Sequence, residues 1–259
     1  MELIFLVAIC ALTALLKQRL GKQLKTNVTF LNLFRLLFHV FVCAHHLYVM
    51  VYLAKMDKSK ITDPAAKMML TYAPVYFTPW NFATQGIYFS LSVLYDLLKV
   101  LSVSPTKLQR TLNNCLNHIY TGGIFPFSIL VFTMFWGLYV IEPEFVFPKS
   151  CEETFPSWLN HSLHSWILIF AFVETSLVIR YPKKPKISIR GFNITFSIYH
   201  ILFVSSRFFI GYWVYPLFNL LTHFQVFVFI WLYYFYMRFL LSLGLQIEKL
   251  KYSFVKYRD

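Results

Sequence analysis

Charged residues are scarce in this 259-residue chain, because Asp, Glu, Lys and Arg together make up only 14% of it. A soluble globular domain carries about 25% charged and roughly 45–50% apolar residues, whereas 58% of this chain is hydrophobic and 20% is aromatic. A water-facing surface cannot accommodate such an excess of apolar side chains. The composition excludes a disordered chain, a collagen-like chain and a disulfide-stapled secreted module. It indicates an integral membrane protein.

Sequence signals of several other protein classes are missing. The four cysteines show no metal-type spacing, and the chain contains no internal repeat, Gly-rich phosphate loop or nucleotide-binding fingerprint. The formal net charge of +13 would ordinarily suggest a nucleic acid partner. However, the basic residues lie in short stretches between apolar runs, which is typical of multi-pass membrane proteins. We therefore expect membrane lipid rather than nucleic acid around this chain, and no cofactor.

Six apolar stretches reach the length of about 20 residues that a membrane-spanning helix needs. They are Val28–Ala54, Val75–Leu97, Ile119–Ile141, Trp158–Ile179, Phe192–Tyr215 and Leu217–Leu243. A shorter apolar stretch within residues 1–16 suits a signal-anchor, an interfacial helix or a short seventh span. The sequence therefore predicts an all-α, multi-pass transmembrane helical bundle that forms a single domain over residues 1–259, with six core helices and this candidate seventh.

Loop charges predict how the bundle is oriented. If the six spans alternate, the basic stretches at 17–25, 98–118 and 180–190 and the basic tail at 246–259 fall on one side. By the positive-inside rule that side is the cytosol, although the lysine-rich loop 55–73 is an exception. We expect a cytosolic C-terminus in a membrane of the endoplasmic reticulum, another endomembrane or the cell surface.

Polar side chains within the spans are unevenly distributed. At 1.5 Å per residue, several of them lie within about 5–14 Å of the non-cytosolic helix ends: Thr78, His164, Arg207, His223, His45 and His46. The cytosolic half offers chiefly Glu174, since Arg35 is expected to snorkel to the interface and Asp96 to lie at a helix end. Intramembrane polar groups often mark functional sites. The distribution predicts a polar cavity open to the lumenal or extracellular side, although any one histidine alone is more often a packing residue.

Two short segments carry the sharper signals. Thr78-Pro79 opens the second predicted span, where Thr as an N-cap followed by Pro is ordinary helix-start chemistry. The same position would also suit a nucleophile, because helix N–H groups can hold an oxyanion. The second segment is Trp158-Leu159-Asn160-His161-Ser162-Leu163-His164.

In this second segment Asn160 or His161 shares a helix face with His164. Two histidines at this spacing could bind a metal, or His164 could be a general base that a neighbour orients. A metal site would need further ligands, and no carboxylate lies at matching depth. We therefore predict no metal site.

Motifs spread from about residue 28 to 245 resemble those of the family that includes the androgen-induced protein and the androgen-dependent TFPI-regulating protein. The matching residues include Phe77-Thr78, Asn81, Gln85, Tyr88-Phe89, Phe135-Trp136, Trp158-Leu159-Asn160-His161 with His164, and Trp213-Val214-Tyr215-Pro216. The resemblance implies a membrane hydrolase that splits fatty acid esters of hydroxy fatty acids. It also implies that Thr78 is the nucleophile and that His164, not His161, is the essential histidine.

On this hypothesis the other polar residues have supporting roles. Asn81 or Asn160 would donate to the oxyanion, and His161 or Asn160 would orient His164. Arg207 would pair with a free carboxylate of the lipid ester substrate. The alternative is a non-enzymatic lipid-binding or signalling membrane protein, whose polar residues bind a ligand or a partner helix.

Overall fold

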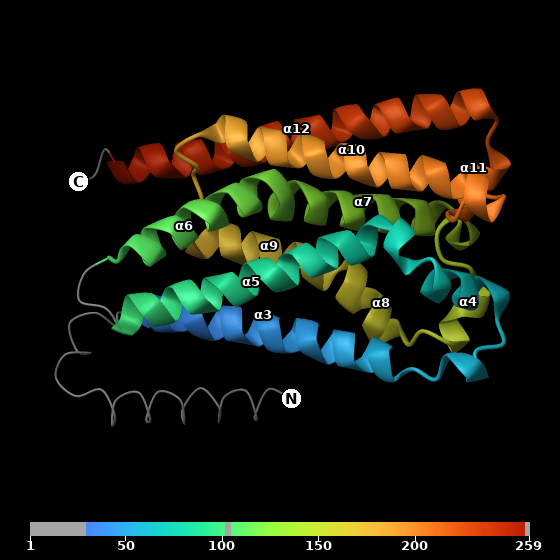
Figure 1. Cartoon of the computed structure of the whole chain (residues 1–259), viewed down its shortest axis with the longest axis horizontal. Helices are drawn as coiled ribbons and strands as arrows, with labels where there is room; N and C mark the ends of the chain where they lie inside the picture. The colour runs from blue at the N-terminus through green and yellow to red at the C-terminus, as the bar shows by residue number, and fades with distance from the viewer. Residues whose placement is uncertain (1–29, 102–104, 257–259) are drawn as a thin grey trace.

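The computed structural model describes residues 30–101 and 105–256. Within these residues every regular element is helical (Figure 1). The candidate helix at 1–16 and the last three residues of the tail lie outside the described residues. The longer helices are α3 (Phe30–Lys55), α5 (Phe77–Leu101), α6 (Lys107–Ile119), α7 (Phe125–Ile141), α9 (Trp166–Leu177), α10 (Pro185–Ile210) and α12 (His223–Lys256). Shorter ones are α4 (Pro64–Thr71), α8 (Ser157–His164) and α11 (Pro216–Leu220), and a π-helical turn at Tyr120–Ile124 joins α6 to α7.

Four helical stretches of the described chain are long and apolar enough to cross a membrane: α3, the continuous stretch Lys107–Ile141, α10 and the stretch His223–Val255 of α12. The described part of the chain is therefore all-helical, and the protein is an integral membrane protein. The other two expected spans are helical but less regular. The buried face of α5 carries polar side chains, and the stretch that contains α8 and α9 is broken at Ser165. The count of six spans stays a prediction.

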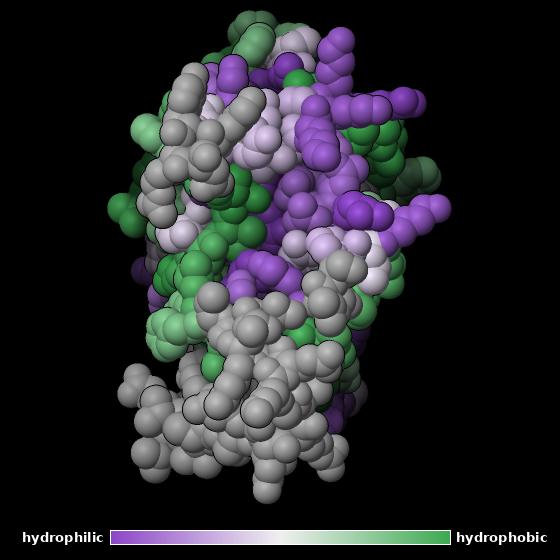
Figure 2. Space-filling model, turned by 90° about the vertical axis from the view of Figure 1, so that its left-hand side faces the viewer, coloured by the Kyte–Doolittle hydropathy of each residue, from purple (hydrophilic) through white to green (hydrophobic). Residues whose placement is uncertain are grey.

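The long helices run along one common direction, and the short ones gather at one end of the bundle (Figure 1). Helix α3 packs against α5, and α5 contacts α6 and α7, while α12 and α10 cover the opposite side of the α6–α7 stretch. Helices α4, α8 and α11 lie at the end where α5 begins (Figure 1). Hydrophilic side chains gather on the other end, between apolar flanks (Figure 2).

Several helix ends differ from the predicted ones, and local chemistry explains why. Helix α10 begins at Pro185 rather than at residue 192, because proline suits the first helical turn. It ends before Gly211, which has a φ of 89° and closes the helix in the left-handed region. Helix α12 begins only at His223, where Thr222 and Gln225 exchange the two hydrogen bonds of a capping box. It continues to Lys256, so most of the expected tail at 246–259 is helical.

Two glycines allow helices to approach closely beside the core. A Cβ at Gly122 would lie 2.7 Å from the carbonyl oxygen of Ser188 in α10. A Cβ at Gly244 of α12 would lie 2.6 Å from the ring of Phe125 in α7. Small residues at such contacts are typical of helix packing in membranes. They allow α10 and α12 to pack closely against the α6–α7 stretch.

Candidate active site

Thr78 is the second residue of α5, and its hydroxyl faces another helix. Its Oγ1 lies 3.3 Å from Nε2 of His164 at the end of α8. The explanation of Thr78 as a helix cap is wrong, because α5 already begins at Phe77. The Phe77 N–H is satisfied by the phenolic oxygen of Tyr215 at 3.0 Å. The Thr78 hydroxyl does not cap the helix and contacts the histidine instead.

The opposite nitrogen of His164 is held by Asn160, one helical turn earlier. The His164 Nδ1 lies 3.0 Å from the backbone carbonyl oxygen of Asn160 and 2.7 Å from its side-chain Oδ1. Because the carbonyl oxygen can only accept, the Nδ1 atom carries the proton. In the neutral ring Nε2 then presents its lone pair to the Thr78 hydroxyl. The ring of Phe135 stacks on the imidazole with 3.6 Å between centroids and an interplanar angle of 11°, which fixes the plane of the ring.

A cavity of about 420 Å³ opens beside this pair. Thr78, Asn160 and His164 line it together with His200 of α10. Its remaining wall is mostly apolar and aromatic, and it is drawn mainly from α3, α4, α5, α7, α8, α10, α11 and α12. Representative residues are Met69, Phe82, Leu130, Met134, Phe218 and Ile230. Such a lining favours an alkyl chain, and the few polar groups on it favour a polar function in that chain.

The other expected site residues lie elsewhere. His161 is exposed, its Nδ1 lies 3.1 Å from Ser165 Oγ, and its ring stacks on Trp136, so Asn160 alone takes the orienting position at His164. Asn81 is fully buried and is not part of the cavity wall, which separates its amide from an oxyanion formed in the cavity. Arg207 donates to the carbonyl oxygen of Gly211 at the end of α10 and also lies outside the cavity wall.

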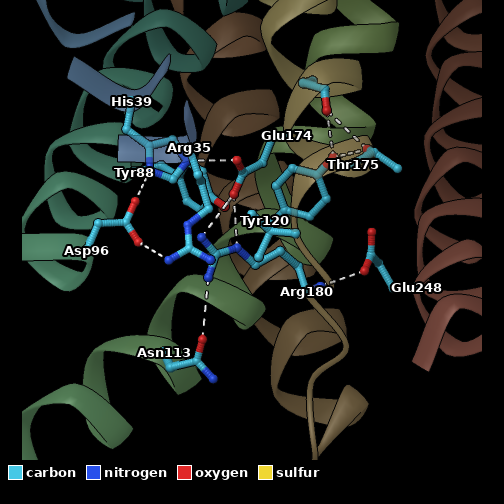
Figure 3. A network of polar contacts seen from close by, with 12 residues as sticks. Arg35, His39, Tyr88, Asp96, Asn113, Tyr120, Glu174, Thr175, Arg180 and Glu248 are labelled. Atoms are coloured by element: carbon cyan, nitrogen blue, oxygen red, sulfur yellow. Dashed lines mark hydrogen bonds and ion pairs between the residues drawn. The ribbon is translucent and has the colours of Figure 1, made fainter. Parts of the chain in front are cut away.

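The sequence interpretation missed a buried charged cluster, which we define as Arg35, His39, Asp96, Glu174 and Arg180 (Figure 3). Asp96 accepts from Arg35 at 2.5 Å and lies 2.8 Å from His39 Nδ1. The other ring nitrogen of His39 lies 2.8 Å from Glu174, which also pairs with Arg180 at 2.9 Å. Tyr88 donates to the same carboxylate.

This charged cluster corrects three expectations. Arg35 does not snorkel, since it bonds Asp96, and Asp96 is buried rather than placed freely at a helix end. The sequence led us to expect chiefly Glu174 in this half of the bundle. Among residues 30–101 and 105–256, however, this half holds the densest group of charged side chains. The only local signal was the spacing of Arg35 and His39, which places them on one helix face.

No group of three or more His, Cys, Asp or Glu side chains in the described part of the chain is arranged to hold a metal ion. In the charged cluster, arginine side chains occupy positions beside both carboxylates. At Thr78 and His164, no carboxylate lines the cavity. The arrangement at that cavity is a hydroxyl, an imidazole and an orienting amide in an apolar wall.

Comparisons with known proteins agree with the resemblance seen in the motifs. A family model described as FAR-17a/AIG1-like protein matches residues 34–249. The androgen-dependent TFPI-regulating protein of Mesocricetus auratus is 32% identical over 156 residues, which cover 60% of this chain and 66% of that protein, just under two thirds of its length. The human protein of that name is 27% identical over 191 residues, covering 72% and 79% of the two chains. The human androgen-induced gene 1 protein is 29% identical over 156 residues, covering 54% and 64%.

No solved structure matches the chain. The family model, in contrast, spans far more than half of the chain and includes Thr78, Asn160 and His164. The chain therefore belongs to the FAR-17a/AIG1-like family.

Proposed function

We propose that this protein is a membrane-embedded lipid ester hydrolase in which Thr78 is the nucleophile and His164 the general base. The observation that carries the proposal is the 3.3 Å contact between Thr78 Oγ1 and His164 Nε2 in the wall of an apolar cavity. A threonine hydroxyl alone is a weak nucleophile, so it needs an adjacent base. Asn160 supports this role because it keeps the proton on Nδ1 and leaves Nε2 free to accept.

The reaction would proceed in two steps. In the first, His164 Nε2 takes the hydroxyl proton while Thr78 Oγ1 attacks the ester carbonyl carbon. The bond from that carbon to the alcohol oxygen breaks, and His164 returns the proton to the leaving alcohol. In the second step, water attacks the acyl-threonine, His164 takes the proton of the water, and Thr78 leaves and is protonated again. The products are one carboxylic acid and one alcohol.

Two groups beside Thr78 are suited to hold the oxyanion. The side-chain oxygen of Asn160 faces His164, which leaves its NH₂ group to donate within the cavity. At the start of α5, Tyr215 accepts from the Phe77 N–H and Pro79 has no N–H, so the backbone N–H of Thr78 is the second group that can donate there. Loss of one oxyanion donor typically costs about 100–1000-fold in rate.

The substrates that we propose are fatty acid esters of hydroxy fatty acids, which is the class that the family resemblance implies. Their long alkyl chains suit a wall built largely from Leu, Met, Phe and Ile side chains. We also propose that the end of the bundle with α8 and the start of α5 faces the lumen or cell exterior. The basis is the group of exposed lysines Lys183, Lys184 and Lys186 near the opposite end, which would place the C-terminus in the cytosol.

The test is hydrolysis of such an ester by the detergent-purified protein. We expect the wild type to turn over, and both Thr78→Ala and His164→Ala to lose activity at least about 100-fold, whereas Thr78→Ser retains part of it. The matched controls are Thr71→Ala and His223→Ala, which change exposed residues outside the cavity wall and should retain activity. An inert wild type, or a fully active Thr78→Ala, would refute the proposal.

The apolar wall of the cavity also favours the second candidate, a protein that binds lipid without cleaving it. A covalent serine-hydrolase probe separates the two functions. An activated Thr78 should become labelled, and Thr78→Ala should abolish the labelling. A lipid-binding protein would remain unlabelled. Its bound lipid would still exclude other hydrophobic ligands from the cavity.

A further inference from the structure

A group of buried polar side chains lies beside the Thr78–His164 pair but outside the cavity wall. We call it the α3–α5–α8 polar cluster and define it as His45, His46, Asn81, Gln85 and Ser162. Asn81 and Gln85 are fully buried and follow Thr78 by three and seven residues, so they share its face of α5.

Contacts from four helices, α3, α5, α8 and α9, converge on this cluster. Gln85 Nε2 donates to the carbonyl oxygen of Ile167 at 2.8 Å, just beyond the break between α8 and α9. His45 Nε2 lies 3.1 Å from Ser162 Oγ of α8. The ring of His46 stacks at 4.1 Å on Phe82, the residue after Asn81. The cluster is therefore a buried polar region between α3, α5 and α8.

The cluster offers more polar atoms than its protein contacts use. Among the described residues no hydrogen-bond partner is found for either polar atom of the Asn81 side chain, for Gln85 Oε1, for His45 Nδ1 or for His46 Nε2. A buried polar atom without a partner is costly, and in native proteins such atoms are paired with protein or with ordered water. Both donors and acceptors are available here, as an internal water with two to four partners requires.

We propose that the α3–α5–α8 polar cluster binds ordered water and delivers the water that cleaves the acyl-threonine. This inference rests on the proposed hydrolase function. The cavity itself is apolar, and after the first step an acyl chain occupies it, so water would reach the ester more readily from a polar side. The cluster provides that side, because Asn81 stands one helical turn from Thr78.

The geometry suits a single bridging water. Side chains three residues apart on a helix have Cβ atoms about 5–6 Å apart, which two hydrogen bonds through one water can span. Because Thr78 Oγ1 lies 3.3 Å from His164 Nε2, a water between the Asn81 amide and Thr78 can also donate to that nitrogen, which no longer receives the Thr78 proton once the oxygen is acylated. His164 takes one proton, the water oxygen bonds to the carbonyl carbon, and the bond to Thr78 Oγ1 breaks. The proton then passes to Thr78, and the acid is released with the oxygen of the water.

The experiment separates the two steps in the full-length protein with an ester substrate. For Asn81→Leu we expect the first equivalent of alcohol to be released at close to the wild-type rate. Steady-state turnover should fall about 10-fold or more, since the attacking water loses a hydrogen bond. Acyl-Thr78 should accumulate and be visible by intact and peptide mass spectrometry. Asn81→Ser, which keeps a polar group, should restore part of the turnover.

A second variant and a matched control complete the design. His46→Phe retains the stack on Phe82 but removes the ring nitrogens. It should also accumulate acyl-Thr78. This variant keeps the test decisive if Asn81→Leu does not fold. Ser92→Ala is the control, because Ser92 is equally buried and also unpaired among the described residues but lies 14 residues beyond Thr78. It should have wild-type kinetics for both steps.

The outcomes distinguish this inference from the function on which it rests. Wild-type turnover together with unchanged Asn81→Leu and His46→Phe would overturn the water-delivery role alone. The water-delivery role would also be overturned if both variants slowed the first release of alcohol as strongly as they slowed steady-state turnover. A wild type that neither hydrolyses the ester nor forms acyl-Thr78 would overturn the proposed hydrolase and this inference with it.

Discussion

The carboxylate of Glu174 lies at the centre of the charged cluster, and its replacement by glutamine should strongly destabilise the bundle. Glu174 is 0% exposed. It accepts from Tyr88, from His39 at 2.8 Å and from both Nε and Nη2 of Arg180 at 3.0 and 2.9 Å. Glu174→Gln keeps the shape but removes the charge, so Arg180 stays buried without its paired anion, whereas His39 retains Asp96.

The expected magnitude follows from the cost of an uncompensated buried charge. Removing one partner of a buried ion pair typically costs about 3–5 kcal/mol. In a chain of this size about 1 kcal/mol corresponds to roughly 2–4 °C in Tm, so Glu174→Gln should lower Tm by roughly 6–20 °C. The measurement is thermal unfolding of the detergent-purified protein, followed by tryptophan fluorescence.

Two comparisons make this reasoning refutable. Glu153→Gln changes an exposed carboxylate and should shift stability by no more than about 0.5 kcal/mol. Replacing both charges, as Glu174→Leu with Arg180→Met, should cost less than Glu174→Gln alone, because no buried charge is left unpaired. A Tm for Glu174→Gln equal to that of the wild type would show that the cluster does not stabilise the fold. A double variant much less stable than the single one would show that packing rather than charge pairing matters.

Two further predictions concern the cavity and a loop. Asn160→Leu should lower kcat about 100-fold or more while the protein stays folded, because it removes the side-chain contact to His164 and an oxyanion donor. A kcat within a few-fold of wild type in a steady-state assay would contradict this role. Asp63 caps α4, and the N–H of Ala66 chiefly lowers the pKa of this carboxyl below its usual value. A lowered folded-state pKa stabilises the protein above the unfolded-state pKa, and this stabilisation is lost as the pH falls through the folded-state value. Asp63→Ala should therefore lower Tm at neutral pH, by an amount that shrinks in acid; a Tm difference independent of pH would argue against the cap.

Much of the architecture could be predicted from local sequence alone. The share of apolar residues and their runs of about 20 residues indicated membrane helices, and the main helices do lie over those runs. The one-turn spacing of Asn160 and His164 placed them on one helix face, and the structure joins them by two contacts. These features depend on hydropathy and on the 3.6-residue period of a helix, both of which are local.

Helix ends were less predictable because short-range hydrogen bonds decide them. The capping box at Thr222 and the proline at 185 set where α12 and α10 begin, independently of where hydropathy rises or falls. At α5 the deciding partner is even farther away, since Tyr215 satisfies the first N–H. Thr78 is not a cap because α5 begins one residue before it, at Phe77.

The convergence of side chains was decided by the tertiary structure. Thr78 meets His164 across 86 residues of sequence, and His39 meets Glu174 across 135. Neither pairing follows from a helical period, because each depends on how the helices rotate and pack against one another. Arg207 has a predicted depth similar to that of Thr78 and His164, yet the rotation of α10 leaves it outside the cavity wall. Sequence thus determined the membrane helices and the chemical groups they carry, whereas helix packing decided which groups meet, because a side chain's depth in the membrane does not specify the face from which it projects.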